Sequence, residues 1–594
     1  MKQRSIHPAR NLAVPAIAAA IVLAAGAPPA TAESPGAAPA AACPAEDTGI
    51  TLSPGFCATV FADGLGHVRH LVVTADGTVY ANTWSGRYYD NDTPPPGGFL
   101  LALKDSQGTG HADIVKRFGE SVSDGAAGGT GIALYKNALY AEVNDRIERH
   151  PLAPGEMVPS AKPEVILSGM PLTGDHPMHP FVIDAKGELF VDSGSATNSC
   201  QSENRMPASA GIQPCTELET RGGIWRYDAN KTGQTFSPAE RFATGIRNGE
   251  GFAFDAAGRL FVTQHGRDQL SQNWPKLYTV KQGADLPAEE FVQLRQGGDY
   301  GWPECYYDQH QKRLVLAPEY SGDGGKTAGV CAGKLPPVAA FPGHWAPNDL
   351  LIYTGSGFPK PYRDGAFIAF HGSWNRAPLP QGGYNVVFQP MAKGKASTPY
   401  IVFADGFAGV HKDPGRAAFR PTGLAMGPDG ALYIADDVHG RIWRVTYHGD
   451  ATTARLAPAP QPVVAAASAN SPLPPEGMHP DAGRATAELP VPPGATREQV
   501  ALGERIFQGE VSNGTCSGCH GPDAGGTSVG PALNSGVWVQ TDGSLASIAD
   551  TITTGVTHPR NYTGVMPPKG GAPLSDADVA AVAAYVWAIG HSGK

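Results

Sequence analysis

The stretch FVIDAKGELFVDSG, residues 181–194, contains two apolar, β-rich runs that are joined by a Lys-Gly turn. A tight polar turn between two such runs is typical of a β-hairpin. The segment GAFIAFHGSWNR, residues 365–376, indicates a further inner strand without the hairpin turn. We therefore expect hairpin repeats to form much of the chain. The clearest other copies are HLVVTADGTVYANT (70–83), GIALYKNALYAEV (131–143), GFAFDAAGRLFVTQHG (251–266) and GLAMGPDGALYIADD (423–437).

The spacing of these repeats favours a β-propeller. Successive turns lie about 50 to 70 residues apart, which leaves room for the four strands of a propeller blade with insertions. We predict an all-β, six-bladed propeller over residues 43–447, with a β-sandwich of irregular hairpins as the alternative. A polar residue follows the second strand of each clear copy, and in a propeller these residues would gather at one end of the central channel. They are Asn82, Glu142, Asp192, Gln264 and Asp436.

The composition of the chain limits its partners. Only 17% of the 594 residues are charged, whereas glycine and proline number 75 and 54, which is typical of a turn-rich β protein with an unstructured linker. The formal net charge is −10, so the chain has no basic excess that would favour a phosphate backbone. We therefore expect no nucleic-acid partner.

The first residues have the features of a secretory signal. Lys2, Arg4 and Arg10 are followed by an apolar run over residues 12–27 and by Ala-Thr-Ala, which ends at Ala32. A retained membrane anchor is the alternative, but the apolar run is short and is followed by prolines. We predict that residues 1–32 are a signal peptide and that the mature protein is periplasmic and has no membrane span.

Export makes disulfide bonds possible. Six cysteines lie outside the C-x-x-C-H motif described below, and they form three couples that are close in sequence. Several connectivities are open to six cysteines. We predict the pairs Cys43–Cys57, Cys200–Cys215 and Cys305–Cys331, each of which would close a loop.

The pattern changes near the C-terminus. Residues 448–496 are rich in alanine and proline and lack periodicity, which predicts an extended, semi-stiff linker. Residues 497–594 have apolar residues near helical spacing, and Ser575 is the expected N-cap of the last helix. We predict a small all-α domain there.

The segment TCSGCHGPDA, residues 515–524, contains the C-x-x-C-H motif of c-type haem attachment. Cys516 and Cys519 would form thioethers to the haem, and His520 would ligate its iron. A dithiol redox pair is the alternative. We expect the sixth iron ligand to be Met566, in GVMPPKGG, with His558 as the rival.

Residues 497–594 resemble the class I cytochrome c family throughout. The resemblance rests on the N-terminal helix, C-x-x-C-H, Gly-Pro-Ala-Leu at residues 530–533, Met-Pro-Pro, and a final helix with Tyr585 and Trp587. It implies that the Pro531 carbonyl holds the proton on His520.

Several polar residues of the propeller region lie at equivalent places in different repeats. Because three arginines are among them, they would need anions to balance their charge, and a small tricarboxylated cofactor would suit them. No G-x-G-x-x-G motif follows a strand, so a Rossmann-type nicotinamide or flavin site is unsupported. The residues are Asp175, His176, His179, Arg247, Asn248, residues 264–268, His344, His371, Trp374, Asn375, Arg376 and Arg420.

At these residues the chain resembles the soluble sugar dehydrogenases that depend on pyrroloquinoline quinone (PQQ), the glucose/sorbosone dehydrogenase family, and more closely its pyranose or sorbosone branch. The resemblance covers about 400 residues and implies a six-bladed propeller. It rests on six motifs in order: TGDHPMHPFVID, TGIRNGEGFAFD, QHGRDQ, GGDYGWPE, AFHGSWNR and FRPTGLAMGPDG.

The resemblance also implies roles for individual residues. His176 matches the general base that takes the proton from the sugar hydroxyl, and Asp175 would lie behind its ring and orient it. Arg247 and Asn248 match residues that contact the quinone oxygens, so that Arg247 would stabilise developing negative charge. His179 has no counterpart in the family, so a structural role and a role in the site are equal alternatives for it.

The remaining assignments concern the cofactor and a metal. Gly266 and Arg267 match positions whose main-chain carbonyls hold Ca²⁺. Arg376 and Arg420 match the cationic positions that bind the PQQ carboxylates. His265 joins the PQQ-binding set, although the bacterial glucose enzymes carry a different polar residue there. The segment after His344 and Trp345, APND, does not align with the family.

The sequence as a whole predicts a periplasmic quinoprotein dehydrogenase. A sugar, which could be an aldose, a pyranose or a sorbosone-like ketoaldose, would be oxidised with Ca²⁺-bound PQQ. Electrons would pass to the haem c of the same chain and then to an external cytochrome or respiratory-chain acceptor. Two other classes are open, namely a Ca²⁺-dependent propeller hydrolase such as a lactonase, and a sugar-binding propeller with a docked cytochrome.

Overall fold

The structure is a computed structural model. It describes residues 43–85, 95–120, 127–376, 379–410, 412, 417–461, 489–509, 511–512, 514, 516–521, 524–526, 530–557, 559–560, 562, 565–572 and 574–592. The predicted signal segment 1–32, most of the predicted linker (462–488) and His558 lie outside the described residues. Among the helices of the described part, none is both long and apolar enough to cross a membrane.

Six sheets each contain four antiparallel strands, and in five of them these strands follow one another in chain order, whereas the sixth takes its fourth strand from the N-terminal segment. They are the blades of a β-propeller, as predicted. In the first three blades the strands are β3 (Val68–Val73), β4 (Val79–Ser85), β5 (Leu100–Lys104) and β6 (Ile114–Phe118); β8 (Ile132–Tyr135), β9 (Ala138–Val143), β10 (Arg146–Pro151) and β11 (Glu164–Ser168); and β12 (Phe181–Ile183), β13 (Glu188–Ser193), β14 (Gly223–Asp228) and β16 (Arg241–Thr244).

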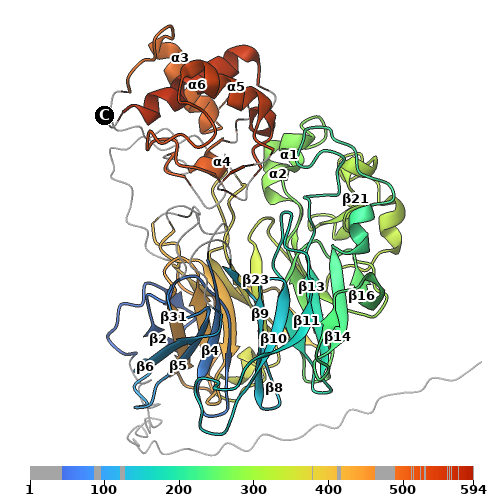
Figure 1. Ribbon diagram of the computed structural model, residues 1–594, viewed down its shortest axis with the longest axis vertical. Helices are drawn as coiled ribbons and strands as arrows, with labels where there is room; N and C mark the ends of the chain where they lie inside the picture. Colours follow the sequence, from blue (N-terminus) through green and yellow to red (C-terminus); the bar gives the residue numbers. More distant parts are fainter. Residues whose placement is uncertain are drawn as a thin grey trace, which may run out of the picture. The chain divides into compact units, whose positions relative to one another are not determined.

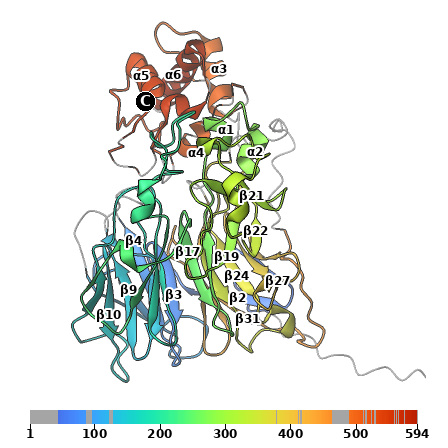
Figure 2. The ribbon, with the colours of Figure 1, turned by 90° about the vertical axis from the view of Figure 1, so that its right-hand side faces the viewer.

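The last three blades are built in the same way, and Figure 1 and Figure 2 label strands from most of the six sheets. The strands are β17 (Gly249–Phe254), β18 (Leu260–Gln264), β19 (Glu289–Gln293) and β22 (Ala339–Phe341); β23 (Pro347–Ile352), β24 (Ala366–Phe370), β25 (Asn385–Gln389) and β28 (Ile401–Asp405); and β29 (Pro421–Met426), β30 (Leu432–Asp436), β31 (Ile442–Tyr447) and β2 (Phe56–Ala62).

The N-terminal strand completes the last blade. Strand β2 pairs antiparallel with β31, with Phe56 opposite Tyr447, although almost 400 residues separate them in the chain. The short strand β1 (Thr51–Leu52) pairs with β28 in the preceding blade. Pairing between the two ends of the repeat array closes the ring, so that no blade edge is left open at the junction.

All five predicted hairpins are present as antiparallel pairs of first and second strands. The expected inner strand in segment 365–376 was wrong. The segment 365–376 contains β24, which is the second strand of its blade, whereas the inner strand is β23, in the APND segment that could not be aligned. Thirteen residues connect these two strands in place of a tight turn, counted from the end of β23 to the start of β24.

The hydrophobic cores lie between adjacent blades. Phe190 and Ile224 of the third blade, for example, pack against Leu260, Val262 and Val292 of the fourth, and all five are at most 5% exposed. Each strand alternates its side chains between two neighbouring sheets, so apolar residues on both faces are buried. This packing fixes the blades around the axis and so positions the loops at the end of the channel.

The repeated polar residues hold the loops at the channel end instead of facing a ligand. Glu142 accepts hydrogen bonds from the backbone N–H groups of Thr130, Gly131 and His179. Gln264 accepts from the N–H of Arg247 at 3.0 Å, and Asp436 from that of Arg420 at 2.6 Å. Buried backbone groups use the hydrogen-bonding capacity of these side chains, so their role at the channel end is to position loops.

All three predicted disulfides are formed: Cys43–Cys57, Cys200–Cys215 and Cys305–Cys331. The short elements near them belong to loops between the blade strands. These are β7 (Ala127–Gly128), β15 (Gln234–Thr235), β20 (Cys305–Asp308), β21 (Arg313–Leu316), β26 (Met391–Ala392), β27 (Lys395–Ala396), α1 (Leu270–Asn273), α2 (Val280–Asp285), and the 3-10 turns η2 (Thr216–Glu219), η3 (Pro238–Glu240), η4 (Pro318–Tyr320), η5 (Gly329–Gly333) and η6 (Lys360–Tyr362).

The C-terminal region is helical, as predicted. It contains α3 (Arg497–Phe507), α4 (Cys516–His520), α5 (Leu545–Thr554), η7 (Pro568–Gly571) and α6 (Asp576–Gly590). Ser575 caps α6, with its side chain accepting from the N–H of Asp578. Gly503 lets α3 approach α6 closely, because a Cβ atom there would lie 2.0 Å from the carbonyl oxygen of Ala581. The helices enclose a separate small core.

Candidate functional site

A cavity at the end of the propeller channel collects most of the predicted site residues. Its walls come from segments of all six blades or the loops that join them. Of the predicted set, Asp175, His176, Arg247, Asn248, His265, Gly266 and Arg420 line it, together with His344, His371, Trp374 and Asn375. Four further charged residues of its wall were not among the predicted site residues, namely Arg69, Arg205, Glu250 and Glu289, whereas Asp268 lies in the predicted stretch 264–268.

His176 is held in one orientation. Its Nδ1 lies 2.9 Å from the carbonyl oxygen of Ser195 and 3.0 Å from the Ser195 hydroxyl. Because a carbonyl can only accept, Nδ1 carries the proton and Nε2 keeps its lone pair. Burial, reinforced by the charge of Arg247, holds the pKa of His176 well below its ordinary value, so the ring is neutral. His176 therefore presents a basic nitrogen in a site that contains guanidinium groups.

Space for the His176 side chain depends on Gly194. A Cβ atom at that position would lie 2.7 Å from the Cβ of His176 and 2.8 Å from Oδ1 of Asn248. Contacts under 3 Å between such atoms force a displacement. The glycine after β13 thus allows two predicted site residues to approach the strand end.

Asp175 does not orient His176, contrary to the prediction. Its carboxylate accepts from Nε of Arg205 at 3.0 Å and forms an ion pair with Nη2 of Arg205 at 2.8 Å. Asn204 lies 3.4 Å away as a weaker donor. Ser195 orients the histidine instead, because Asp175 is turned toward the buried arginine.

Asp268 connects the two arginines next to His176. Its Oδ2 lies 3.0 Å from Arg205 and 3.0 Å from Arg247, and its Oδ1 accepts from Asn375 at 2.5 Å. Burial disfavours the charged carboxylate, but Arg247 and Arg205 hold the pKa of Asp268 well below its usual range. Asp268 is therefore ionised and fixes both guanidinium groups.

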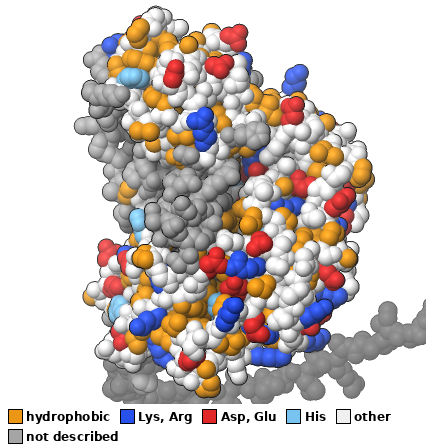
Figure 3. Space-filling model, viewed as in Figure 1, with side chains coloured by type: hydrophobic (Ala, Val, Ile, Leu, Met, Phe, Trp, Pro, Cys, Tyr) orange, Lys and Arg blue, Asp and Glu red, His pale blue; other side chains and the backbone are white. Residues whose placement is uncertain are grey.

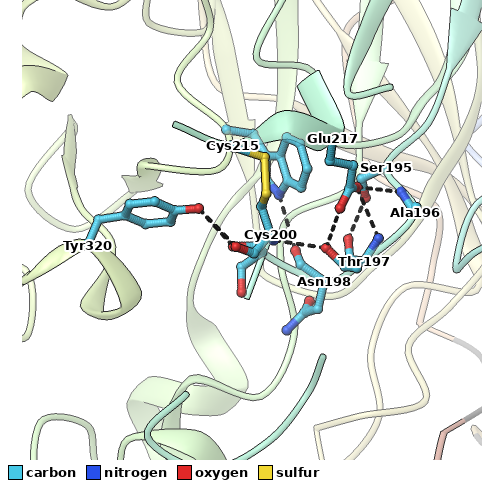
Figure 4. Close-up of a disulfide and its surroundings, with 10 residues drawn as sticks. Ser195, Ala196, Thr197, Asn198, Cys200, Cys215, Glu217 and Tyr320 are labelled. Carbon is cyan, nitrogen blue, oxygen red and sulfur yellow. Dashed lines mark hydrogen bonds between the residues drawn. A yellow bond between two sulfur atoms is a disulfide. The ribbon is translucent and has the colours of Figure 1, made fainter. Parts of the chain in front are cut away.

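The Cys200–Cys215 disulfide anchors this network, and Figure 4 shows its surroundings. Asn198, two residues before the disulfide, accepts from Arg247 at its carbonyl (3.0 Å) and at Oδ1 (3.1 Å). Its Oδ1 also accepts from the N–H of Asp268, and its Nδ2 donates to the Asp268 carbonyl. The loop that the disulfide closes supplies Arg205 itself.

The carbonyl of Asn198 also accepts from the indole N–H of Trp302 at 3.1 Å. On the other side of the disulfide, Glu217 accepts from the hydroxyl of Thr197 and from two backbone N–H groups (Figure 4). The backbone of Arg205 is itself left-handed, with φ +61°. Such backbone is uncommon for a side chain of this size and persists only where its surroundings enforce it.

Four arginines concentrate positive charge at the cavity wall. Arg69, Arg205, Arg247 and Arg420 face four carboxyl groups, but burial raises the pKa of Glu250 and raises that of Glu289 to about 7. Burial thereby disfavours the ionised form of both carboxyl groups, which leaves the arginine charges less fully balanced. An anionic ligand would balance the remaining charge.

The two predicted arginines of the wall are fixed by main-chain oxygens. Arg247 donates to the carbonyl of Gly266 at 2.8 Å, and Arg420 donates to those of His371 (3.0 Å) and Gly372 (2.9 Å). Guanidinium groups held in this way lose little freedom when a ligand binds. The residues present therefore fit a small polycarboxylate such as PQQ.

Arg376 and His179 lie outside this arrangement. Arg376 donates to the carbonyls of Ala284, Gly343 and Pro380 and pairs with Asp285, so it fastens neighbouring loops. The ring nitrogens of His179 lie 3.1 Å from the carbonyl of Asp192 and 2.9 Å from that of Pro171. Both contacts are to protein backbone, which favours the structural role for His179.

Two further histidines of the wall, His265 and His371, are buried and neutral. Burial, with a contribution from Arg247, lowers the pKa of His265 to about 3, and burial with Arg420 lowers that of His371 to about 4. His344 approaches the carbonyls of Gly283 and Leu286 through Nε2 and Asn375 through Nδ1. The three rings form part of the cavity wall.

The predicted calcium position does not suit a cation as it stands. The carbonyl of Gly266 already accepts from the Arg247 guanidinium, and the Arg267 side chain donates to the Asp268 carbonyl and pairs with Glu319. Among the described residues, no group of three His, Cys, Asp or Glu side chains could hold a metal ion. The residues present do not fit Ca²⁺ in this arrangement.

A second cavity lies in the helical domain. Cys516, Cys519, His520 and Met566 line it, with apolar neighbours that include Phe507 and Ile548. Nδ1 of His520 lies 2.9 Å from the carbonyl oxygen of Pro531, as the resemblance to cytochromes c implied. This contact leaves Nε2 available for an iron. Met566 is held by backbone pairing with Val556. The residues of the cleft fit a haem that is attached through the two cysteines.

Charges on the outer surface show no matching concentration. Figure 3 shows Lys and Arg side chains interspersed with Asp and Glu over the visible face. A surface of this kind gives no basic patch for nucleic acid on that face. The fixed positive charge lies in the cavity instead.

Comparison with known proteins separates the two regions. The TrAA12-like family model matches residues 50–448, and the model of cbb3-type cytochrome c oxidase subunit III matches residues 498–586. A Coprinopsis cinerea protein named pyrroloquinoline quinone-dependent pyranose dehydrogenase is 26% identical over 239 residues, which are 34% of this chain and 30% of that protein. The chain spans at most 49% of the length of the first curated relatives it matches.

Two solved structures share the propeller fold. The holo PQQ domain of pyranose dehydrogenase from Coprinopsis cinerea has a TM-score of 0.52 and 19% identity, and the match covers 68% of this chain and 99% of that one. The calcium structure of a family AA12 carbohydrate-active enzyme from Trichoderma reesei has a TM-score of 0.52 and 19% identity, with coverages of 67% and 97%. With residues 50–448 matched, the chain belongs to the TrAA12-like family, and its C-terminal helical domain is a cytochrome c domain.

Proposed function

We propose that the protein is a quinoprotein dehydrogenase that oxidises a sugar with PQQ and passes the electrons to a haem c in the same chain. One observation carries the proposal: a neutral histidine with a fixed tautomer, His176, faces a cationic cavity in a chain that also contains a haem cleft. The name of the Coprinopsis cinerea relative supports PQQ and a pyranose. Aldoses and sorbosone-like sugars remain within the same substrate class.

His176 would act as the general base. Its Nε2 lone pair would take the proton of the substrate hydroxyl, while the Ser195 carbonyl stabilises the proton already on Nδ1. PQQ, when bound, would supply the hydride acceptor. Arg247 and Asn248 would face that acceptor, since Arg247 is held by Asn198 and Asp268 and places fixed positive charge beside the histidine.

The carboxylates of PQQ need cationic partners. Arg420 lines the cavity, and its orientation is set by the carbonyls of His371 and Gly372. His265 would complete the wall on the other side. Arg376 would not contact the cofactor. It would support the site indirectly, by holding neighbouring loops in place.

In the cytochrome domain, His520 and Met566 would ligate the iron of a haem bound to Cys516 and Cys519. That haem would supply a one-electron acceptor. The Pro531 carbonyl would fix the His520 ring, and the thioether of Met566 would raise the potential relative to a nitrogen ligand. His558, the rival ligand, lies outside the described residues.

Calcium at Gly266 and Arg267 stays a prediction from the resemblance. The Trichoderma reesei neighbour is described as a calcium structure. In this chain the Gly266 carbonyl would have to exchange its bond from Arg247 for the metal. No step of the proposed reaction depends on it.

The setting of the enzyme follows from its cysteines and its haem. Three disulfides favour an oxidising compartment, in agreement with the proposed export to the periplasm. Electrons would leave to an external cytochrome or another acceptor of the respiratory chain.

The proposal is tested with the purified full-length protein. PQQ is added with and without Ca²⁺, sugars are added one at a time, and the haem absorption is followed. We expect a sugar to reduce the haem only when PQQ is present. If PQQ does not bind and no sugar reduces the haem, the proposal fails.

Two variants separate the role of His176 from that of Asp175. His176→Ala should bind PQQ but reduce the haem roughly 10² to 10⁴ times more slowly with substrate. Asp175→Asn should leave the acidic limb of the pH–rate profile in place, because Ser195, and not Asp175, contacts the ring. A base pKa that moves in Asp175→Asn but not in a Ser195→Ala control would assign the orienting role to Asp175 after all.

A further inference from the structure

The haem cleft differs from the propeller cavity in its charge. Among the described residues that line it, none is a Lys, Arg, Asp or Glu. Its wall is mainly apolar, and its polar side chains come chiefly from one segment before α5 and from α5 itself. They include Gln540, Thr541, Thr551 and Tyr562.

The side chain of Gln540 stands out among them. Its Nε2 atom is buried and has no hydrogen-bond partner in the structure. The two threonines are satisfied, since Thr541 donates to the Ser547 hydroxyl at 2.7 Å and Thr551 donates to the Ser547 carbonyl at 2.8 Å. A buried amide donor without an acceptor is destabilising. On a residue that lines a ligand cleft, such a donor indicates an acceptor on the ligand.

A c-type haem offers an acceptor of one kind at its edge, the propionate carboxylates. We propose that Nε2 of Gln540 donates a hydrogen bond to a haem propionate, and that this neutral amide takes the place of a cation. The inference rests on the haem half of the proposed function. It names the group that recognises the polar edge of the haem, while Phe507, Ile548 and the other apolar residues contact the ring.

The charged groups nearby do not compensate a propionate. Asp542 accepts from the N–H of Ser544, and Nζ of Lys569 donates to the Leu574 carbonyl and lies 3.6 Å from Asp576. Arg560 is exposed, and it is not among the residues that line the cleft. Because none of the described residues that line the cleft is a Lys or Arg, a hydrogen bond from the Gln540 amide would stabilise the ionised propionate in place of a cation.

This arrangement has a measurable consequence. An ionised propionate near the iron favours the ferric state, so the haem midpoint potential falls as pH rises through the propionate pKa. A hydrogen bond to a charged group lowers that pKa, and one bond corresponds to roughly one pH unit or more. The potential falls at the pH where the propionate ionises. Loss of the Gln540 amide should therefore raise this pH by roughly one unit.

The experiment uses the full-length protein with its covalent haem, verified by the absorption of the reduced pyridine complex. Midpoint potentials are titrated against pH for the wild type, Gln540→Leu, Gln540→Arg and the control Thr551→Val. Thr551 lines the same cleft, but its hydroxyl is already bonded to Ser547. The break is the pH at which the midpoint potential begins to fall. We expect this pH to rise in Gln540→Leu, to fall in Gln540→Arg and to stay unchanged in Thr551→Val.

Two outcomes overturn the inference: a break at the same pH in the wild type and Gln540→Leu, or equal shifts in Gln540→Leu and Thr551→Val. If Gln540→Leu does not fold, Gln540→Arg decides alone through the sign of its shift. The propionate bending band in resonance Raman spectra should change in the Gln540 variants at fixed pH and not in the control. A protein that carries no haem c at all would refute the proposed function instead.

Discussion

The ion pair between Arg205 and Asp175 provides a quantitative test of the propeller site. Nε and Nη2 of Arg205 lie 3.0 and 2.8 Å from Oδ2 of Asp175, and the two side chains are 10% and 12% exposed. Removing one partner of such a buried pair leaves an uncompensated charge, at a cost of about 3–5 kcal/mol. We therefore expect Arg205→Met and Asp175→Asn each to lower the free energy of unfolding by about 3 kcal/mol.

The double variant should lose much less than the sum. Once one partner is gone, removal of the other no longer breaks a pair, so we expect a coupling energy of about 2–3 kcal/mol. Unfolding of the propeller in urea, followed by circular dichroism in the β region, gives the four free energies. Asp268 keeps its pair with Arg247 in all four proteins, so the cycle isolates the outer half of the network.

The exposed pair Arg226–Glu188 in the same blade is the matched control. Its nitrogen–oxygen distance is 3.3 Å, but its side chains are 38% and 42% exposed. Solvent screening should limit its coupling to about 0–1 kcal/mol. Additive losses at Arg205 and Asp175, to within about 0.5 kcal/mol, would refute the reasoning that this buried pair organises the site.

Two further predictions concern other parts of the chain. Met566→Ala should lower the haem midpoint potential and abolish the absorption band of the iron–thioether bond, and an unchanged spectrum would assign the sixth position to another ligand. The double variant that replaces Cys200 and Cys215 by alanine should lose about 3 kcal/mol of stability and also PQQ affinity, because that loop carries the groups that hold Arg247 and Asp268. The same change at Cys43–Cys57 should affect stability alone, and an equal loss of PQQ affinity there would show that the effect is not local.

The sequence was sufficient for the repeated elements. Five hairpins could be predicted because each combines two apolar runs with a turn that requires Gly or Asn, and both signals are local. The three disulfides followed from the closeness of their cysteines in the chain. The contact between His520 and Pro531 came from the resemblance to cytochromes c and is present at 2.9 Å.

The errors concern features that depend on distant parts of the chain. Strand β23 has no tight turn after it, so the inner strand of its blade was assigned to β24. Asp175 was predicted to orient the ring of His176, its neighbour in the sequence, but its partner is Arg205, thirty residues away. An arginine inside a loop closed by two cysteines was the available signal for Arg205, and nothing local shows which carboxylate it meets.

The role of the repeated polar residues could not be predicted for a similar reason. Asn82, Asp192 and Gln264 recur at matching places because every blade has buried backbone groups at its channel end. Periodicity alone does not distinguish a side chain that holds a loop from one that faces a ligand. The residues that do face the cavity follow the strands irregularly, as Arg247 and Arg420 do.

Electron transfer from a sugar through PQQ to the haem can be measured by rapid mixing. The PQQ-loaded full-length protein is mixed with sugar, and the haem absorption is followed. We expect the haem to be reduced when both PQQ and a sugar are present. We also expect His176→Ala to slow this reduction roughly 10² to 10⁴ times at an unchanged PQQ affinity. A haem that every sugar leaves oxidised in the PQQ-loaded protein, or that a sugar reduces without PQQ, would contradict the proposed function.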